Sequence, residues 1–291
     1  MVKLTPEQVK TKEVLEWKGL HLFHFEESTC SRKVRMVLAL KRLDYTPHHV
    51  DISVHENVSE FYLGINPRGL VPCLVHDGEV VIESNDIVTY LEEAFPEPRL
   101  LDSEAEAAAA KEDGLHMAMR ALTFSMKLPP GAGYWSEDVR RTYATLGDKV
   151  AGGGQDMKEQ FDFWAKYSEG NCVPEALVDE AVVAFRFAFD GLERKLVEGG
   201  GDGKFFPPVT AAPTMTDLIW FPTFRRVKHC GYDMARHPRL LAWEAACLAC
   251  PAFAAEAEQP DVVLAPAIQA YLYLSGSDFE SRAERLMSIY A

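Results

Sequence analysis

The stretch from Leu20 to Arg35, LHLFHFEESTCSRKVR, constrains the fold of this chain more than any other. Its first part, Leu20–Phe25, predicts a short apolar strand that stops at two glutamates. A turn of hydroxyl and thiol side chains over residues 28–31 then opens an amphipathic helix, which is predicted over residues 31–43. Such a turn receives the first N–H groups of the helix, which have no partner within the helix.

Ser28 and Cys30 are the candidate reactive side chains of this turn. The unpaired N–H groups and the positive end of the helix dipole stabilise a thiolate that is placed there. Ser28 can donate its O–H to such a thiolate, and Cys30 can itself become one. The alternative is that Ser28 or Thr29 only caps the helix, because helix starts favour Ser and Thr with no chemistry attached.

Charged side chains surround this turn. On the predicted helix, Val34, Val37 and Leu38 form part of an apolar line, and we expect the basic residues to fill the remaining surface; these are Arg32, Lys33, Arg35 and Arg42. The acidic pair Glu26-Glu27 opposes ionisation of a thiol in the turn, whereas the basic residues favour it. The sequence leaves the sign of the balance open.

Two further motifs follow along the chain. Residues 66–72 read N-P-R-G-L-V-P, and Glu83-Ser84 opens a second predicted helix. With S-T-C-S-R-K-V-R over residues 28–35, these motifs resemble the glutathione transferase family. The run at 28–35 is similar to the start of its zeta class, the maleylacetoacetate isomerases, whose first Ser works on the glutathione thiol. It is also similar to the tetrachlorohydroquinone reductive dehalogenases, which use the Cys.

The resemblance implies glutathione as the cofactor and a set of residues that bind it. A cis Val71-Pro72 bond would turn the Val71 backbone outwards, to pair with glutathione as an added strand does. Glu83 would accept from the γ-glutamyl ammonium and Ser84 would bind the γ-glutamyl carboxylate at a helix start. The alternative is a simple N-cap at Ser84 and a solvated Glu83. The expected site consists of Ser28 and Cys30 as catalytic residues, and of Leu70, Val71, Pro72, Glu83 and Ser84 as glutathione-binding residues, with no metal.

Leu70 departs from the zeta-class pattern, because that class has a glutamine directly before its V-P. One side-chain contact to glutathione is therefore missing, and Leu70 could contribute to the site only through its backbone.

The pattern predicts an α/β domain followed by an all-helical domain, the glutathione transferase fold. Residues 1–18 are expected to form a polar, partly helical extension, and residues 19–97 a thioredoxin-like, glutathione-binding domain with a mixed sheet. In that sheet 45–52 is a strand parallel to the first, and Asp77-Gly78 marks an antiparallel hairpin. Residues 103–291 are expected to form the helical substrate domain, with a ligand cleft between the domains.

Within the helical domain, helices are predicted over 104–126, 137–166, 174–197 and 243–253, with an amphipathic tail over 266–291. The sequence Thr214-Met215-Thr216-Asp217 predicts a capping box. Candidates for an apolar wall of the cleft are Met117, Met126, Tyr134, Trp135 and Trp220.

Composition indicates which binding partners, cellular locations and cysteine roles are expected. The net charge of −14 argues against binding to nucleic acid or to anionic membranes, which needs a basic face. The charged N-terminus and the lack of a long apolar run predict a cytoplasmic protein. Six cysteines in 291 residues do not indicate a disulfide framework. The pair Cys247 and Cys250 lies in an apolar run without a second ligand pair, so we expect a structural role.

Ser28 and Cys30 lead to two mechanisms. With Ser28, the protein would be a glutathione-dependent transferase or lyase that attacks a small, aromatic electrophile or thioether; residues 221–227 and 243–247 look like bacterial glutathione lyases that process lignin-derived aromatics. With Cys30, it would be a thiol-disulfide reductase or reductive dehalogenase. A third hypothesis is a non-catalytic interaction module with the same fold. The resemblance also implies a homodimer and a role in aromatic compound metabolism or detoxification.

Overall fold

The computed structural model describes residues 1–125, 163, 173–199, 205–206 and 212–258. These residues fall into two compact units; the first contains Met1–Pro98, and the second begins at Arg99. Several expectations fall outside the described residues: the helix over 137–166 apart from residue 163, the tail over 266–291, and the wall candidates Met126, Tyr134 and Trp135.

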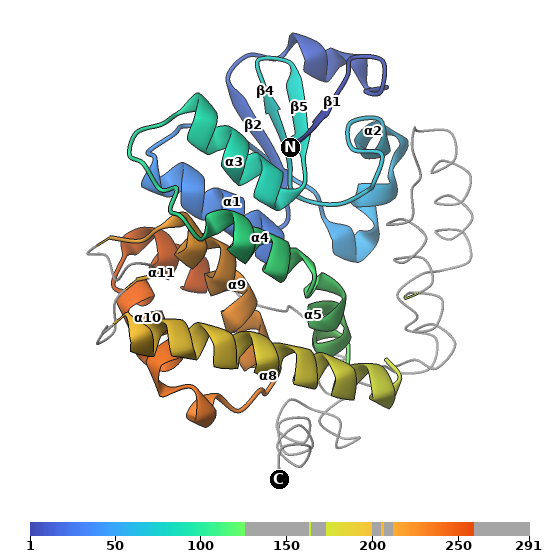
Figure 1. Ribbon diagram of the computed structural model, residues 1–291. Helices are drawn as coiled ribbons and strands as arrows, with labels where there is room; N and C mark the ends of the chain where they lie inside the picture. The colour runs from blue at the N-terminus through green and yellow to red at the C-terminus, as the bar shows by residue number, and fades with distance from the viewer. Residues whose placement is uncertain (126–162, 164–172, 200–204, 207–211, 259–291) are drawn as a thin grey trace. The chain divides into compact units, whose positions relative to one another are not determined.

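The first unit is built on a mixed five-stranded sheet with the strand order β1-β5-β4-β2-β3 (Figure 1). Strand β2 (Leu20–His24) pairs in parallel with β3 (Thr46–His49), and helix α1 (Thr29–Leu40) is the crossover that a parallel pair needs. Strand β4 (Cys73–His76) pairs antiparallel with β2 and with β5 (Glu79–Ile82). The predicted mixed sheet, parallel strand and hairpin are therefore confirmed.

Both faces of the sheet are buried. Because strand side chains alternate between faces, Phe23, Cys73 and Ile82, which lie in register, share one face, and their neighbours share the other; these neighbours are Leu22, Leu74 and Val81. Helices α1 and α3 (Ser84–Ala94) pack against each other beside the sheet (Figure 1). Short helical segments complete the unit: η2 (Ile52–Val54), η3 (Glu56–Val58) and α2 (Glu60–Leu63).

The N-terminal residues form part of this core, so the expectation of a tail was wrong in that respect. Strand β1 (Val2–Leu4) pairs antiparallel with β5, and a short 3-10 helix, η1 (Lys12–Glu16), follows it. Val9 and Val14 are fully buried in the same cluster as Phe23. The charged composition of these residues gave no sign of this role. A few well-spaced apolar side chains are enough to hold an edge segment on a core.

The second unit is helical where the structure describes it. Helix α5 packs against α8, and α4 packs against α9. Helix α10 packs against α8 and α11. The elements are α4 (Ala105–Asp113), α5 (His116–Thr123), α8 (Glu175–Glu198), α9 (Met215–His229), η4 (Met234–Arg236), α10 (Pro238–Leu248) and α11 (Pro251–Glu258).

Two predicted helices of this unit are broken in the structure. The helix predicted over residues 104–126 is divided into α4 and α5, because α4 ends at Gly114. The helix predicted over residues 243–253 corresponds to the end of α10 and the start of α11, since Pro251 begins a new helix. Within the described residues no single helix is long and apolar enough to cross a membrane; α10 and α11 meet that test only as a pair, bent by 101°.

The predicted capping box is confirmed, and its carboxylate is buried in the second unit. Asp217 is fully buried and accepts from the Thr214 N–H (2.7 Å), the Phe206 N–H (2.9 Å) and the Trp243 ring N–H (2.7 Å). Burial raises the pKa of Asp217 to about 6 although these donors favour the charged form. Trp220, a candidate for the cleft wall, is likewise buried, with 1% of its surface exposed.

Two glycines test whether the N-terminal extension is structural. Gly78 and Gly19 have φ values of +86° and +79°, so an alanine is strained at both, at a cost of about 1 kcal/mol. A Cβ at Gly78 would lie 2.2 Å from the Leu15 carbonyl oxygen, whereas a Cβ at Gly19 meets nothing within 4 Å. We expect Gly78→Ala to lower the free energy of unfolding by about 3 kcal/mol or more, measured by urea titration. Equal losses in Gly78→Ala and the control Gly19→Ala would contradict docking of the extension.

Candidate glutathione-binding site

Ser28 occupies the turn between β2 and α1. Its hydroxyl oxygen accepts from the Ser31 N–H (3.2 Å), and its own N–H donates to the Phe25 carbonyl (3.2 Å). Ser28 is therefore the N-cap of α1, as the simpler interpretation predicted. A hydroxyl that accepts this bond keeps its hydrogen for another acceptor, so capping and donation to a ligand are compatible at this half-buried residue.

Cys30 is the second residue of α1 and carries a half-buried thiol that is not in a disulfide. It lies among the first N–H groups of the helix, where the helix dipole favours a negative charge. The structure thus places both predicted catalytic residues within the same helical turn, two positions apart.

The basic side chains of α1 are buried, which corrects the expectation that they fill a solvated surface. Arg32, Lys33 and Arg35 expose 3%, 1% and 8% of their surface. The guanidinium groups turn back to the preceding loop: Arg32 Nε and Arg35 Nη2 donate to the Glu26 carbonyl at 3.2 and 2.9 Å. Charge-assisted bonds of this kind offset the desolvation of the cations, and they hold the turn in place.

The acidic residues of the turn are also engaged. One carboxylate oxygen of Glu26 lies 2.6 Å from His49 Nδ1, and the other oxygen lies 4.0 Å from His24 Nδ1. Arg35 Nη1 donates to His24 Nδ1 (3.1 Å), which fixes that nitrogen as an acceptor. Burial, and then the charge of Arg35, lower the pKa of His24 to about 4.

The loop before β4 presents the backbone of Val71. The Val71-Pro72 bond is cis, as the resemblance implied. The Leu70 carbonyl accepts from the Tyr62 hydroxyl (2.6 Å) and from Asn66 Nδ2 (2.7 Å), so the backbone of Leu70 serves the loop itself. In the described part of the chain, the N–H and C=O of Val71 make no hydrogen bond, which leaves them for an added strand.

Glu83 adopts an uncommon backbone conformation directly before α3. Its φ is +69°, in the left-handed region that costs a non-glycine residue about 1 kcal/mol or more. Its carboxylate lies 2.6 Å from Arg68 Nη1, with about a third of both side chains exposed. Glu83 is thus paired rather than solvated, and backbone strain of this kind is typical of residues in functional sites.

Ser84 is the first residue of α3 and is 5% exposed. The structure shows no side-chain N-cap at this helix start, so the alternative of a simple cap does not describe Ser84. Instead, its hydroxyl oxygen accepts from Lys33 Nζ (3.4 Å), and Asn85 Oδ1 accepts from the same ammonium (2.7 Å).

The three motifs meet at one end of the sheet. Phe23 near the end of β2 pairs with Cys73 at the start of β4, and Cys73 pairs with Ile82 at the end of β5. The Ser28 turn follows Phe23 within a few residues, Val71 lies just before Cys73, and Glu83-Ser84 comes directly after Ile82. Antiparallel pairing therefore gathers predicted site residues that lie far apart in the sequence.

Sequence reasoning missed Arg68 and Lys33 as members of this site. Arg68 stands inside the N-P-R-G-L-V-P motif, which offered no reason to pair it with Glu83. Lys33 did carry a signal, because it lies four residues before the buried Val37 and therefore on the same helix face.

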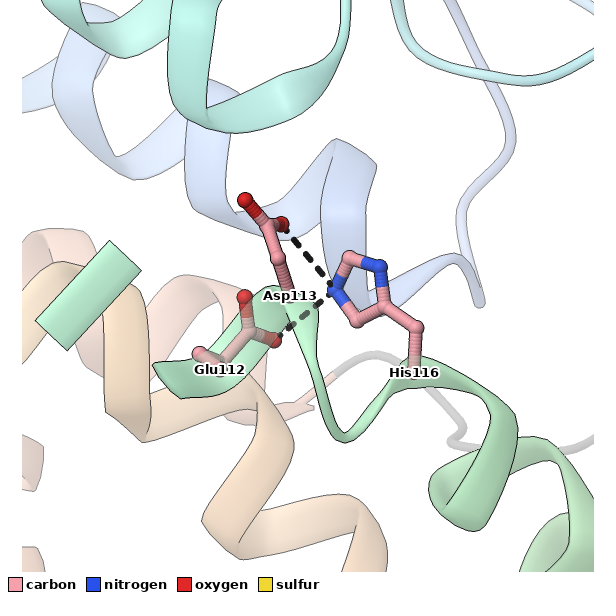
Figure 2. Close-up of side chains that lie close together, drawn as sticks. All are labelled: Glu112, Asp113 and His116. Atoms are coloured by element: carbon pink, nitrogen blue, oxygen red, sulfur yellow. Dashed lines mark hydrogen bonds and ion pairs between the residues drawn. The ribbon is translucent and has the colours of Figure 1, made fainter. Parts of the chain in front are cut away.

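Other clusters of polar or thiol side chains lie in the second unit. The Glu112 and Asp113 carboxylates converge on His116 Nε2, at 3.2 and 3.8 Å (Figure 2). Glu112 is buried and also accepts from the Thr223 hydroxyl (2.5 Å), so it ties α4 to α5 and α9. The possible ligand atoms of Glu112, Asp113 and His116 lie within 4.8 Å of one another. Cys247 is buried, and burial raises its pKa well above the usual range, as suits a structural thiol.

Comparison with known proteins supports the assignment of the first unit. Residues 22–99 match the family model for the N-terminal domain of glutathione S-transferases. The maleylacetoacetate isomerase of Pseudomonas aeruginosa is 43% identical over 88 residues, which cover 29% of this chain and 42% of that protein. The first curated relatives are thus matched over less than half of their own length.

Solved structures extend the similarity over most of the chain. The β-etherase LigF of Sphingobium sp. strain SYK-6 is 25% identical, with a TM-score of 0.64, over 82% of this chain and 98% of that structure. A maleylacetoacetate isomerase of Anaeromyxobacter dehalogenans, solved with glutathione in its active site, is 25% identical, with a TM-score of 0.52, over 84% of this chain and 98% of that structure. The predicted glutathione transferase resemblance and fold class are confirmed.

His24, beside the turn, makes the free energy of unfolding depend on pH. Because its pKa falls from 6.5 to about 4 on folding, the unfolded chain binds the proton more tightly between these values. The free energy of unfolding then falls as the pH is lowered through this window, by about 2 kcal/mol from pH 7 to pH 5. We expect His24→Gln, which cannot titrate, to lose this part of the slope in urea titrations. Parallel stability curves for the variant and the wild type would contradict the assignment.

Proposed function

Because residues 22–99 of this chain are a glutathione S-transferase N-terminal domain, we propose that the protein binds glutathione and activates its thiolate for attack on a small electrophile. The observation that carries the proposal is the Ser28 hydroxyl, which accepts the capping bond of α1 and keeps its hydrogen for the thiolate. The thiolate would lie at the positive end of a twelve-residue helix, where a negative charge is favoured.

The remaining predicted residues would hold the tripeptide. The unpaired N–H and C=O of Val71, before Pro72, would pair with the cysteinyl backbone of glutathione as an added strand. Glu83 would accept from the γ-glutamyl ammonium in exchange for Arg68, at little cost because that ion pair is part-exposed. Ser84 and the first N–H groups of α3 would bind the γ-glutamyl carboxylate. Leu70 would contribute only the loop geometry, since its carbonyl is already bonded twice.

We propose an aromatic ether, thioether or halide as the electrophile. The similarity to the β-etherase LigF, which covers most of both chains, supports an etherase or lyase reaction. In such a step the glutathione sulfur forms a bond to carbon while the carbon–oxygen, carbon–sulfur or carbon–halogen bond breaks, and the leaving group departs with the electron pair. A homodimer with a role in aromatic metabolism or detoxification is proposed on the resemblance alone. A cytoplasmic location is proposed on the charged N-terminus and the lack of a long apolar run.

A second candidate uses Cys30, because its half-buried thiol lies in the first turn of the same helix and is not in a disulfide. Its thiolate would attack the sulfur of an aryl glutathione thioether, forming a Cys30–glutathione disulfide and releasing the aryl carbanion, which takes a proton. A second glutathione thiolate would then attack the glutathione sulfur of this mixed disulfide. The products are glutathione disulfide and the Cys30 thiolate. The aryl carbon is reduced, and the two glutathione sulfurs are oxidised.

Ser28→Ala and Cys30→Ala separate these candidates. If Ser28 activates the thiolate, we expect Ser28→Ala to lower kcat/KM on aromatic ether or halide substrates by on the order of 10²-fold. Cys30→Ala would then leave the rate unchanged. A protein that gains one glutathionyl mass from oxidised glutathione, and loses both that mass and its activity in Cys30→Ala, would support the disulfide mechanism instead.

Ser59→Ala is the matched control for loss of a helix cap. The Ser59 hydroxyl caps α2 by accepting from the Tyr62 N–H at 3.2 Å, as Ser28 does for α1. Both variants should lose about 1 kcal/mol of stability, but only Ser28→Ala should lose turnover. If calorimetry shows no glutathione binding by the wild-type protein, the proposed enzyme is wrong, and a non-catalytic module is favoured.

A further inference from the structure

Lys33 differs from the other buried cations of α1 in the groups that it contacts. Arg32 and Arg35 donate to carbonyls of the turn that precedes their own helix. Lys41, at the end of α1, lies 2.7 Å from the Glu92 carboxylate and also donates to the Phe95 carbonyl (2.7 Å). Lys33 instead reaches the start of α3. Two hydrogen bonds therefore link the Lys33 ammonium to that helix start.

The Lys33 ammonium determines how Ser84 presents its hydroxyl. It donates to Asn85 Oδ1 at 2.7 Å and to Ser84 Oγ at 3.4 Å. Because an ammonium can only donate, the Ser84 oxygen is the acceptor, and the Ser84 hydrogen is left to be donated elsewhere. An anion at the start of α3 is the acceptor that this arrangement suits.

Positive charge from three sources converges at this point. Helix α3 has eleven residues, so its dipole and its first N–H groups favour an anion at Ser84. The Ser84 hydrogen adds a directed donor, and Lys33 adds a full charge. With 1% of its surface exposed, Lys33 acts through a medium of low dielectric constant, where a charge is felt more strongly and is screened less by salt.

We propose that Lys33 is the positioning residue of the anion subsite, and that it makes binding of the γ-glutamyl α-carboxylate of glutathione depend on the buried positive charge behind Ser84. This inference rests on the proposed function. Lys33 acts through Ser84 and through its field, without touching the ligand. The other half of the zwitterionic head group is served by Glu83.

Two analogues of glutathione separate the carboxylate from the ammonium. The tripeptide 4-aminobutyryl-cysteinyl-glycine lacks only the α-carboxylate, and glutaryl-cysteinyl-glycine lacks only the α-ammonium. Dissociation constants of both analogues and of glutathione would be measured by calorimetry for the wild type, Lys33→Gln and Lys33→Arg. Lys33→Gln keeps a donor for Asn85 but removes the charge, whereas Lys33→Arg keeps the charge.

We expect Lys33→Gln to weaken binding of glutathione and of the glutaryl analogue by about tenfold or more, because the variant loses the buried positive charge that attracts the carboxylate. Binding of the aminobutyryl analogue should not change. Lys33→Arg should restore most of the affinity for the two carboxylate ligands. A merely structural role of Lys33 would weaken all three ligands alike.

The matched control is Lys41→Met combined with Glu92→Gln. It removes an equally buried lysine from the same helix without leaving the Glu92 carboxylate unpaired. Thermal unfolding of each variant gives the loss of stability, and the control should lose stability without selectivity among the three ligands.

The outcomes are distinct. If the wild type binds glutathione and Lys33→Gln weakens all three ligands equally, or none, the inference is overturned while the proposed function stands. The inference is likewise overturned if both Lys33 variants discriminate among the three ligands as the wild type does. If the wild type binds none of the three ligands, the proposed function fails, and the inference fails with it.

Discussion

The burial of positive charge along α1 is the constraint on which the first unit depends. A guanidinium or ammonium can lie in a core only where acceptors surround it, because an uncompensated buried charge costs several kcal/mol. In α1 the acceptors are the carbonyls of the turn before the helix, the start of α3 and the Glu92 carboxylate near its end. The same contacts that satisfy these cations hold the Ser28 turn and the start of α3 in register, so the geometry of the site follows from the desolvation of α1.

The second unit uses the opposite charge for a similar purpose. Asp217 is a buried carboxylate that accepts from the start of its own helix, from the Phe206 backbone and from the Trp243 ring. Each of these donors belongs to a different segment, so the carboxylate ties them together. Glu112 does the same for α4, α5 and α9. Satisfied buried charges therefore specify how neighbouring elements meet in both units, whereas apolar packing alone specifies it less sharply.

Much of the first unit could be predicted because its signals are local. The short apolar run Leu20–Phe25, the hydroxyls that open α1 and the Asp77-Gly78 turn each act over a few residues, and each predicted its element correctly. The errors concern interactions across the chain. Val2–Leu4 looked like part of a polar tail because its partner strand β5 is distant in sequence: Val2 pairs with Ile82, 80 residues later. The basic residues of α1 looked solvated because their acceptors are not neighbours in sequence.

The sequence by itself determined the order of strand, turn and helix, the residues available at each turn, and the motifs that identify a glutathione S-transferase domain, because these depend on short-range backbone preferences and side-chain chemistry. Only the tertiary structure decided which of those residues meet. Antiparallel pairing of β2, β4 and β5 brought Ser28, Val71 and Glu83-Ser84 to one end of the sheet. The packing of α1 on α3 placed Lys33 against Ser84, 51 residues away. The physical reason is that partners of buried polar groups are chosen by the fold that buries them.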